Sequence, residues 1–348
     1  MEVLEIVSTG PLATVQDLGR PGRMKYGVPP GGALDREALQ VANALVGNDL
    51  GAPGVEITLG GFSAVALRPV LVAVAGAWAP MDVDGVPAQP YTTVQLEAGQ
   101  TLNIGHAAWG ARVYLAVAGG VAARAVLGSA STFGRGKMGG LDGDGKPLRS
   151  GDTITAAGGQ AQSPGSMNPS AARDWATAAL IRRAAALASA GTAEGAVMLR
   201  VVMGPQDHLF TEDGITTFTS SVYVVTPLTD RMGARLAGPT VAHKGGADIV
   251  SDGIPAGAIQ IPGDGNPIIM LADRQTTGGY TKIACLASAD LDIAGQLRPG
   301  DHVRFQSVSV EEAHALLEQD RAARTRPSLA LSLLGDGLEH VVRVVEIT

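Results

Sequence analysis

Short apolar runs, each bounded by glycine, proline or aspartate, recur along the whole chain. Most of these runs are rich in β-branched residues, and this combination is typical of buried β-strands. The boundary residues supply the turns that many short strands need. We therefore predict strands at Val3–Val7, Val70–Ala75, Val113–Ala118, Val197–Val202, Val222–Thr226, Ile268–Ala272 and Ile283–Ala287.

Helical periodicity is clear in only three segments. Residues 34–46 place their apolar side chains largely on one helical face. Residues 171–190 are rich in alanine, and residues 310–323 begin with acidic residues, which favour a helix N-terminus. The pattern therefore predicts a mainly β protein with few helices.

Bulk and composition divide the chain into four predicted parts. Residues 156–170 are small and polar, which is typical of a linker or a surface excursion.

A length of 348 residues also favours two lobes over one core. We predict an N-terminal β-rich lobe at 1–155, a linker with an alanine-rich helical excursion at 156–195, a C-terminal β-rich lobe at 196–310, and a helix and tail at 311–348.

A faint internal repeat indicates that the two lobes are duplicated. Leu34-Asp35-Arg36 matches Thr229-Asp230-Arg231, and the segment from Pro69 matches the segment from Pro267 in the same order. Chance alignment of glycine and proline turns is the alternative. A duplication predicts two similar β-rich halves.

Charge and cysteine content exclude several classes of protein. The net charge is −7 without a cluster of Lys and Arg, which argues against binding to nucleic acid or an anionic membrane. The single cysteine, Cys285, excludes an internal disulfide, and the six histidines show no metal-ligand spacing. No apolar stretch is long enough to cross a membrane, and the first ten residues are acidic where a signal peptide is basic. We expect a cytoplasmic protein without a metal site.

Two polar, glycine-rich segments, residues 14–35 and 251–282, carry the candidate chemistry. The second contains LADRQTTGGYTK, which places many hydrogen-bonding groups between two apolar runs. Glycine lets a backbone approach a ligand closely, and exposed amide groups bind anions. The alternative is structural, since Asp17 with Arg20, or Asp273 with Arg274, could simply pin loops.

Two familiar catalytic motifs are absent from the sequence. No Gly-x-Ser-x-Gly nucleophile elbow is present. Gly134-Arg135-Gly136-Lys137 is followed by Met138, where a P-loop needs Ser or Thr. Chemistry by positioning and electrostatics fits the chain better than a covalent nucleophile.

The sequence resembles the carboxyltransferase-like family once called allophanate hydrolase subunit 2. This family includes KipA, the C subunit of bacterial 5-oxoprolinase, and one half of the urea carboxylase carboxyltransferase domain. Leu34 and Thr229 stand where the family usually has Met and Ser, and the tail after about residue 325 lies outside the resemblance. The segments that carry it are TVQDLGRPGRMKYGVPPGGALD at 14–35, VLGSASTFGRGKMGGLDG at 126–143, TPLTDRMGARLAGP at 226–239, and the long run from IVSDGIPAG to ACLASADL at 249–291.

The resemblance implies a fold, the cofactors that the complex uses, and the partner subunits. The fold is that of cyclophilin-like β-barrels, with such a barrel at residues 196–310. The partners are a KipI-like subunit-1 protein and a LamB/YcsF-type subunit, with a small amide or lactam as substrate. ATP is used by the complex, this chain carries no covalent cofactor, and any biotin is carried by a partner. The expected activity is ATP-dependent conversion of 5-oxoproline to glutamate.

Such chemistry needs an amide held in place and negative charge on an oxygen stabilised. We expect Arg274 and Lys282 to offset that charge, with Asp35 as a third catalytic residue. We expect a donor-rich turn at the strand end, with Tyr280 as a wall, and a second group of residues facing it from the first segment. The predicted substrate-binding residues are Gln16, Asp17, Arg20, Tyr26, Gln275, Thr276, Thr277, Gly278, Gly279 and Tyr280.

Two alternative functions stay open at this point. One is a biotin-dependent carboxyltransferase subunit that acts on urea or a similar amide, which requires a separate biotin carboxylase and carrier. The other is a KipA-like regulator that binds a KipI-like kinase inhibitor, in which case the polar loops form an interface and are not catalytic.

Overall fold

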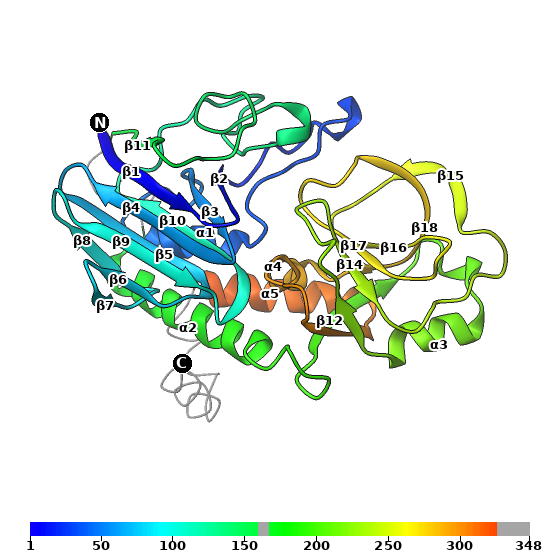
Figure 1. Ribbon diagram of the computed structural model, residues 1–348. Coiled ribbons are helices and arrows are strands. Elements are labelled where there is room, and N and C mark those ends of the chain that lie inside the picture. The colour runs from blue at the N-terminus through cyan, green and yellow to red at the C-terminus, as the bar shows by residue number, and fades with distance from the viewer. Residues whose placement is uncertain (159–166, 326–348) are drawn as a thin grey trace. The chain divides into compact units, whose positions relative to one another are not determined.

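The computed structural model describes residues 1–158 and 167–325. Their contacts divide the chain into two compact units, and each is described by itself (Figure 1). The four-part division predicted from the sequence stays a prediction, and the stretches 159–166 and 326–348 of it lie outside the described residues. The first unit comprises Met1–Arg20, Gly31–Ala185 and the chain from Ala323, and the second comprises Pro21–Pro30 and Ala186–Ala322.

The first unit contains two antiparallel sheets. The six-stranded sheet contains β1 (Glu2–Thr9), β4 (Gly60–Ala66), β6 (Met81–Val83), β7 (Val86–Ala88), β9 (Thr101–His106) and β11 (Thr153–Thr155), in the order β11-β1-β4-β9-β6-β7. The five-stranded sheet contains β2 (Leu12–Gln16), β3 (Gly54–Thr58), β5 (Val70–Trp78), β8 (Thr93–Leu96) and β10 (Trp109–Val117), in the order β2-β3-β10-β5-β8.

Alternation along the strands builds one apolar core from both sheets. In β4 the residues alternate between buried and half-buried, and the buried ones include Phe62 and Ala64. These pack with Leu4 and Ile6 of β1 and with residues of the five-stranded sheet such as Val113. A period of two is what places every second side chain on the same face. The sheets therefore stack face to face over a shared interior.

Two helices cover the other face of the five-stranded sheet. α1 (Arg36–Leu45) and α2 (Pro169–Leu187) pack there around Trp175, in a second apolar cluster that includes Tyr114 and Ala116 of β10. The strand β10 is consequently buried along its whole length. Both helices match segments in which the sequence predicts helical periodicity. A short 3-10 turn, η2 (Gly134–Gly136), lies in the long loop after β10.

The second unit is a closed β-barrel with one added strand. Strand β12 pairs with β19 in parallel and with β18 in antiparallel fashion, and these two pairings close the circuit β12-β19-β13-β14-β17-β16-β18. β15 extends the sheet beside the first half of β18. The strands are β12 (Val197–Met203), β13 (Tyr223–Val225), β14 (Gly233–Ala237), β15 (Asp248–Gly253), β16 (Ala258–Ile261), β17 (Ile268–Met270), β18 (Thr277–Leu286) and β19 (His302–Ser307).

Short helices accompany the barrel. α3 (Glu212–Ser220), which periodicity did not predict, begins at Thr211, whose hydroxyl accepts from the backbone of Gly214 at 2.9 Å. The 3-10 turns are η1 (Met24–Tyr26), η3 (Asp207–Leu209) and η4 (Ser288–Asp290), and α4 (Leu291–Gly295) follows η4.

The last described helix, α5 (Val310–Thr325), starts with a capping box. The backbone of Glu312 donates to the Ser309 hydroxyl at 3.1 Å, and the backbone of Ser309 donates to the Glu312 carboxylate at 2.7 Å. This reciprocal pair satisfies two backbone donors that the first turn leaves free.

The prediction of a mainly β protein with barrel architecture and few helices is confirmed. The duplication stays a prediction. The segments at Pro69 and Pro267 both open strands, β5 and β17, whereas Asp35 caps a helix and Asp230 caps a turn before β14. In residues 1–158 and 167–325, no helix combines the length and apolar character that crossing a bilayer requires.

Candidate functional site

The predicted site residues fall into both units. Gln16, Asp17, Arg20 and Asp35 belong to the first unit, and Tyr26 and residues 274–282 belong to the second. The expectation that the two groups face each other stays a prediction. Within its own unit, each group has a definite set of contacts, and these contacts separate structural residues from candidates for chemistry.

Asp17 and Arg20 tie the loop after β2 to the loop at residues 126–132. The Asp17 carboxylate accepts from the hydroxyls of Ser129 and Ser131 at 2.6 and 2.5 Å, and from the backbone of Ala130 at 2.7 Å. The guanidinium of Arg20 donates to the carbonyls of Val126, at 3.3 Å, and Ser131. Both side chains are buried. These contacts give the pair a structural role, and its predicted role in binding substrate stays a prediction.

Gln16, at the end of β2, is buried as well. Its Nε2 donates to the Thr14 hydroxyl at 3.1 Å and to the Thr132 carbonyl at 3.3 Å. Its Oε1 is buried without a hydrogen-bond partner among the described residues. The side chain therefore offers one acceptor inside the first unit, and its predicted binding role stays a prediction.

Asp35 anchors a buried ion-pair network between α1 and α2. Its Oδ1 accepts from the backbone of Ala38 at 2.8 Å, which caps α1, and its carboxylate receives two bonds from Arg183 at 2.5 and 2.8 Å. Arg183 also donates to Glu37 at 3.0 Å. Asp35 is fully buried and bound on both sides. The contacts support a structural role, and its predicted catalytic role stays a prediction that this geometry does not favour.

The same network sets unusual proton affinities. Burial alone would raise the pKa of Glu37, but Arg183, Arg182 and Arg324 hold it at about 2. The Trp175 indole on α2 also donates to Glu37 at 2.9 Å. The network therefore fastens α2 to α1, and the Glu37 carboxylate in it stays ionised throughout the neutral range.

The stretch LADRQTTGGYTK differs from the predicted turn. Strand β18 begins at Thr277, so Thr277, Gly278 and Gly279 are part of a ten-residue strand, and the turn is confined to Leu271–Thr276. The prediction of a donor-rich turn through Gly279 was wrong. Strand β15 provides the pairing partner, since Gly278 lies opposite Asp252. A glycine-rich segment that looks like a loop in sequence becomes a strand through this distant contact.

Arg274 is a buried cation that lies between backbone carbonyls. Its Nε donates to the Ile254 carbonyl at 2.9 Å and its Nη1 to the Leu271 carbonyl at 3.0 Å. Nη2 approaches the sulfur of Met24 at 3.9 Å. Burial lowers the pKa of Arg274. The neighbouring Asp273 pairs with Arg231 at 2.8 Å, so the sequence-based alternative of an Asp273–Arg274 pair was wrong.

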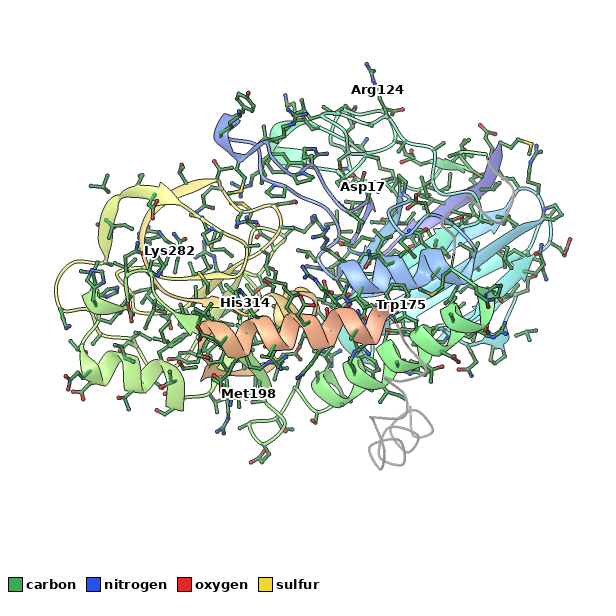
Figure 2. All side chains as sticks on the ribbon, turned by 180° about the vertical axis from the view of Figure 1, so that it is seen from behind. Asp17, Arg124, Trp175, Met198, Lys282 and His314 are labelled. Carbon is green, nitrogen blue, oxygen red and sulfur yellow. The ribbon has the colours of Figure 1, made fainter. Side chains whose placement is uncertain are left out.

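Lys282 is a further buried cation of this unit. Its side chain is 1% exposed, and its Nζ lies 3.3 Å from the Asp252 carboxylate, which is 57% exposed. The Nζ has no hydrogen-bond partner of good geometry among the described residues. Gln206 fixes the backbone of Lys282, since its Oε1 accepts from the Lys282 amide at 3.0 Å and its backbone amide donates to the Lys282 carbonyl at 3.1 Å. Figure 2 marks Lys282 in the barrel.

Amide donors converge around Gly278. A β-carbon added at Gly278 would lie 3.2 Å from the Nε2 of Gln260 and 3.5 Å from the Nε2 of Gln275. It would also lie 2.7 Å from the Cδ1 of Ile254, which is too close. Glycine therefore lets these side chains meet. We call Gln260, Gln275, Lys282, Asp252 and Ile254 the Gly278 cluster.

Strand register explains why the cluster forms. Gln260 of β16 lies directly opposite Lys282 of β18, and Asp252 of β15 lies opposite Gly278. Gly278 and Lys282 are four residues apart on one strand, so they share a face. The side chains of three strands therefore meet on one face of the sheet.

The other predicted residues of this segment lie on more open surface. Tyr26 is exposed, with the Lys25 ammonium 5.0 Å from its ring centre. Tyr280 and Thr277 are exposed, whereas Thr276 and Gly279 are half-buried. The Thr276 carbonyl accepts from the backbone of Ile254 at 3.0 Å. Their roles in binding stay predictions.

The sequence analysis missed Gln260 and Gln206 as members of this site. Gln260 is 1% exposed, and its Nε2 is buried without a partner among the described residues. Its sequence context, Ala258-Ile-Gln-Ile261, is apolar on both sides. A lone amide inside a buried strand is a signal that sequence could have given, because buried polar groups normally need a partner.

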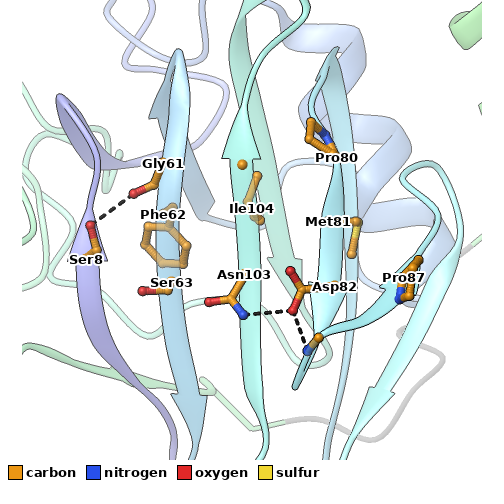
Figure 3. Close-up of a pocket in the computed structure, with 12 residues that line it drawn as sticks. Ser8, Gly61, Phe62, Ser63, Pro80, Met81, Asp82, Pro87, Asn103 and Ile104 are labelled. Carbon is orange, nitrogen blue, oxygen red and sulfur yellow. Dashed lines mark hydrogen bonds between the residues drawn. The ribbon is translucent and has the colours of Figure 1, made fainter. Parts of the chain in front are cut away.

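A hollow on the six-stranded sheet of the first unit is a separate polar feature (Figure 3). Ser8, Ser63, Asn103 and Asp82 stand opposite one another on four neighbouring strands and cross its floor. Asn103 donates to Asp82 at 2.8 Å, and the backbone of Gly85 donates to the same oxygen at 2.8 Å. The hollow measures about 580 Å³. Its polar floor is also what the solvated face of an antiparallel sheet presents.

Metal and nucleotide sites find little support in the described residues. Residues 1–158 and 167–325 contain no group of three metal-ligating side chains. Gly134–Gly136 form an exposed 3-10 turn, followed by Lys137 with a φ of 51°, and not the strand, loop and helix of a P-loop.

Taken together, Arg274, Lys282, Gln260 and Gln275 present two buried cations and two amide donors beside the exposed Asp252 carboxylate. Such fixed donors stabilise negative charge on an oxygen without reorganising when that charge develops. None of the five is a strong nucleophile in this setting. The arrangement suits the binding and polarisation of a carbonyl or carboxylate group.

Comparison with known proteins gives this geometry a context. A family model described as carboxyltransferase domain, subdomain A and B, matches residues 26–307. The C subunit of the 5-oxoprolinase of Escherichia coli K12 is 33% identical over 313 residues, which are 89% of this chain and 93% of that protein. The protein of the same name from Haemophilus influenzae is 32% identical over 315 residues, covering 90% and 94% of the two chains.

A solved structure shares the fold. The crystal structure of Kluyveromyces lactis urea carboxylase superposes with a TM-score of 0.81 at 27% identity. The match covers 93% of this chain but only 29% of that one. This chain thus corresponds to nearly the whole of two bacterial proteins and to less than a third of a much larger enzyme.

Proposed function

Because this chain belongs to the family of carboxyltransferase domains with subdomains A and B, we propose that it is the C subunit of a multi-subunit, ATP-dependent 5-oxoprolinase. The observation that carries the proposal is the end-to-end match to two bacterial proteins of that name.

The geometry of the second unit supports a part in the chemistry. Opening the lactam of 5-oxoproline requires attack on an amide carbonyl, and negative charge then builds on its oxygen. Arg274 and Lys282 are cations held in place by backbone contacts, and Gln260 and Gln275 add neutral donors. A preorganised donor of this kind contributes about 3 to 4 kcal/mol to transition-state stabilisation.

The proposal assigns ATP and the remaining chemistry to the assembled complex. We propose a KipI-like subunit-1 protein and a LamB/YcsF-type subunit as partners. The chain on its own is then inactive, since its residues supply donors and positioning but no nucleophile. Any biotin belongs to a partner, because no step proposed for this chain uses it.

A second function is favoured by one observation. The superposition on urea carboxylase covers almost this whole chain, so the same fold also serves within an enzyme that carboxylates urea. On this alternative, the chain would hold an amide while a carboxyl group passes from the nitrogen of biotin on a partner to the nitrogen of that amide. A planar amide or ureide would occupy the same donors around Gly278.

The test is 5-oxoproline-dependent ATP hydrolysis by the co-expressed complex. Arg274→Ala should reduce turnover by about a hundredfold or more, the effect of losing one preorganised donor. Arg304→Ala is the matched control, because Arg304 is an exposed arginine of the same unit, on β19. It should leave turnover unchanged.

Three outcomes distinguish the functions. Loss of turnover in Arg274→Ala, with the complex still assembled, supports the proposal and the site. No turnover from an intact wild-type complex rejects the 5-oxoprolinase proposal, and urea with carboxybiotin is then assayed. The KipA-like regulator would be favoured if this chain neutralises a KipI-like inhibitor of a sensor kinase and the complex turns over neither substrate.

A further inference from the structure

We propose that the Gly278 cluster recognises a carboxylate group, and that the Asp252 side chain occupies the place which the carboxylate of a ligand takes. The choice of 5-oxoproline as that ligand rests on the proposed function. The carboxylate chemistry itself rests on the donors and acceptors of the cluster.

Apart from the Asp252 carboxylate, the polar side chains of the cluster present hydrogen-bond donors. Lys282 can only donate, and Gln260 and Gln275 both turn their Nε2 donors toward Gly278. Nearby, Arg274 can also only donate. A ligand that satisfies these groups must offer several acceptor oxygens at once. An ionised carboxylate does so, because its two oxygens have about four acceptor positions and no donor.

Two of the donors need such an acceptor. The Nε2 of Gln260 is buried without a hydrogen-bond partner among the described residues, and the Nζ of Lys282 has no partner of good geometry there, although the Asp252 carboxylate lies 3.3 Å away. Burying an unsatisfied polar group is costly, and more so when it is charged. The barrel nevertheless holds both side chains in place, since their residues are opposite each other in the ladder. Buried polar groups that remain without a hydrogen-bond partner in a folded protein usually belong to a binding site.

Asp252 is an acceptor that reaches the cluster from its solvent side. Its carboxylate lies 3.3 Å from the Nζ of Lys282, while its side chain is 57% exposed. The backbone of Gly253 and Lys282 lower the pKa of Asp252, so it is ionised at neutral pH. A ligand carboxylate has the same charge and the same oxygens. It can therefore replace Asp252 at Lys282 and reach Gln260 as well.

Glycine at position 278 fits this role. A β-carbon at position 278 would lie 2.7 Å from the Cδ1 of Ile254, so the end of that side chain would have to move toward the space beside the donors. Ile254 provides an apolar wall, and its carbonyl holds the Arg274 guanidinium at 2.9 Å. A small ligand with a carboxylate and a short apolar ring, such as 5-oxoproline, matches this combination of donors and wall.

The competing interpretation is that Asp252 and Lys282 simply pin β15 to β18. The two interpretations predict opposite effects of Asp252→Asn. If Asp252 stands in for a ligand, its loss frees Lys282, and carboxylates bind more tightly. If Asp252 only holds Lys282 in place, its loss disorders the cation, and carboxylates bind more weakly.

The experiment follows the side-chain amide signals of Gln260 and Gln275 by NMR in the full chain. The signals are assigned by comparison with Gln260→Leu and Gln275→Leu, and the chain is titrated with acetate, with 5-oxoproline and with the neutral primary amide of 5-oxoproline. Lys282→Met removes the cation. Asp248→Asn is the matched control, because Asp248 is an exposed aspartate on the same strand as Asp252.

We expect acetate and 5-oxoproline to shift the Gln260 signal and the neutral amide to leave it unchanged. Asp252→Asn should tighten binding about two- to fivefold, as expected for removing a competing exposed ion pair. Lys282→Met should weaken it at least tenfold, in line with the loss of a charge-assisted hydrogen bond. Asp248→Asn should bind like the wild type.

Equal shifts with the acid and the neutral amide would overturn the inference, as would weaker binding in Asp252→Asn. If Lys282→Met does not fold, Lys282→Arg retains the charge, and acetate binding must then persist. If acetate binds as expected but 5-oxoproline does not, the carboxylate site stands and the proposed 5-oxoprolinase function fails.

Discussion

Replacing Glu37 by glutamine tests the buried network that joins α1 to α2. In the folded chain, the Glu37 carboxylate accepts from Arg183, Arg182 and the Trp175 indole, and Arg324 lies 4.0 Å away. Burial would raise its pKa, but these cations lower it from 4.5 to about 2. One pKa unit corresponds to about 1.4 kcal/mol, so the ionised carboxylate contributes about 3 kcal/mol to the free energy of unfolding.

The sign of the pH dependence follows from the direction of that shift. A carboxyl whose pKa is lower in the folded than in the unfolded chain stabilises the fold above the unfolded pKa. This contribution is complete at pH 7 and declines as the pH falls from about 4.5 toward 2. At pH 3 it has fallen to about 1 kcal/mol, because the unfolded carboxyl is then almost fully protonated.

Urea unfolding of the wild type and of Glu37→Gln at several pH values measures the contribution of Glu37 to the free energy of unfolding. At pH 7 the variant should be less stable by about 3 kcal/mol, and at pH 3 by about 1 kcal/mol. Glu5→Gln is the control, since Glu5 is exposed on β1, and it should change stability by less than about 0.5 kcal/mol. A deficit for Glu37→Gln that stays constant from pH 7 to pH 3 would refute the reasoning.

Three further predictions concern single contacts. Gly278→Ala should abolish the acetate-induced shift of the amide signals, because the new β-carbon displaces Ile254. Circular dichroism should show that the fold is kept, and unchanged acetate binding would contradict the close contact. Asp17→Asn should destabilise the first unit by about 1 to 3 kcal/mol in urea unfolding, since it weakens hydrogen bonds that the buried carboxylate accepts. A loss of turnover without a loss of stability would instead support the predicted role of Asp17 at the substrate. Ser309→Ala should cost about 1 kcal/mol by removing the cap of α5, while Ser309→Thr, which keeps the hydroxyl, should cost little.

Local patterning was enough to predict the main elements. The β-branched run at Val70–Ala75 lies inside β5, and the periodic segment 34–46 contains α1. These features depend on neighbours a few residues apart, which a sequence shows directly. The run at Ile283–Ala287 was predicted too short, because the first half of β18 exists through pairing with β15. Only the fold brings these two segments together.

The same limit applies to the site. Arg274 and Lys282 could be chosen as candidate site residues from the sequence because each is a cation beside apolar runs. Folding must then either bury the charge or expose apolar residues, and both are costly. Sequence could not distinguish them from Arg20 and Asp35, which are just as polar and lie in equally glycine-rich surroundings. The difference lies in their partners, and partners more than a hundred residues away, such as Ser131 for Arg20 and Arg183 for Asp35, are set by topology.

The number of hydrogen-bond partners separates Asp17 and Asp35 from Lys282 and Gln260. Asp17 and Asp35 accept from backbone amides, hydroxyls or a guanidinium on several sides, and every such bond holds a loop or a helix in place. Lys282 and Gln260 have donors that nothing in the described chain accepts with good geometry. Hydrogen bonds that are already made stabilise a fold, whereas donors that are fixed and unmet are available to a ligand. For this reason the barrel around β18, and not the loop after β2, is where a substrate oxygen should be sought first.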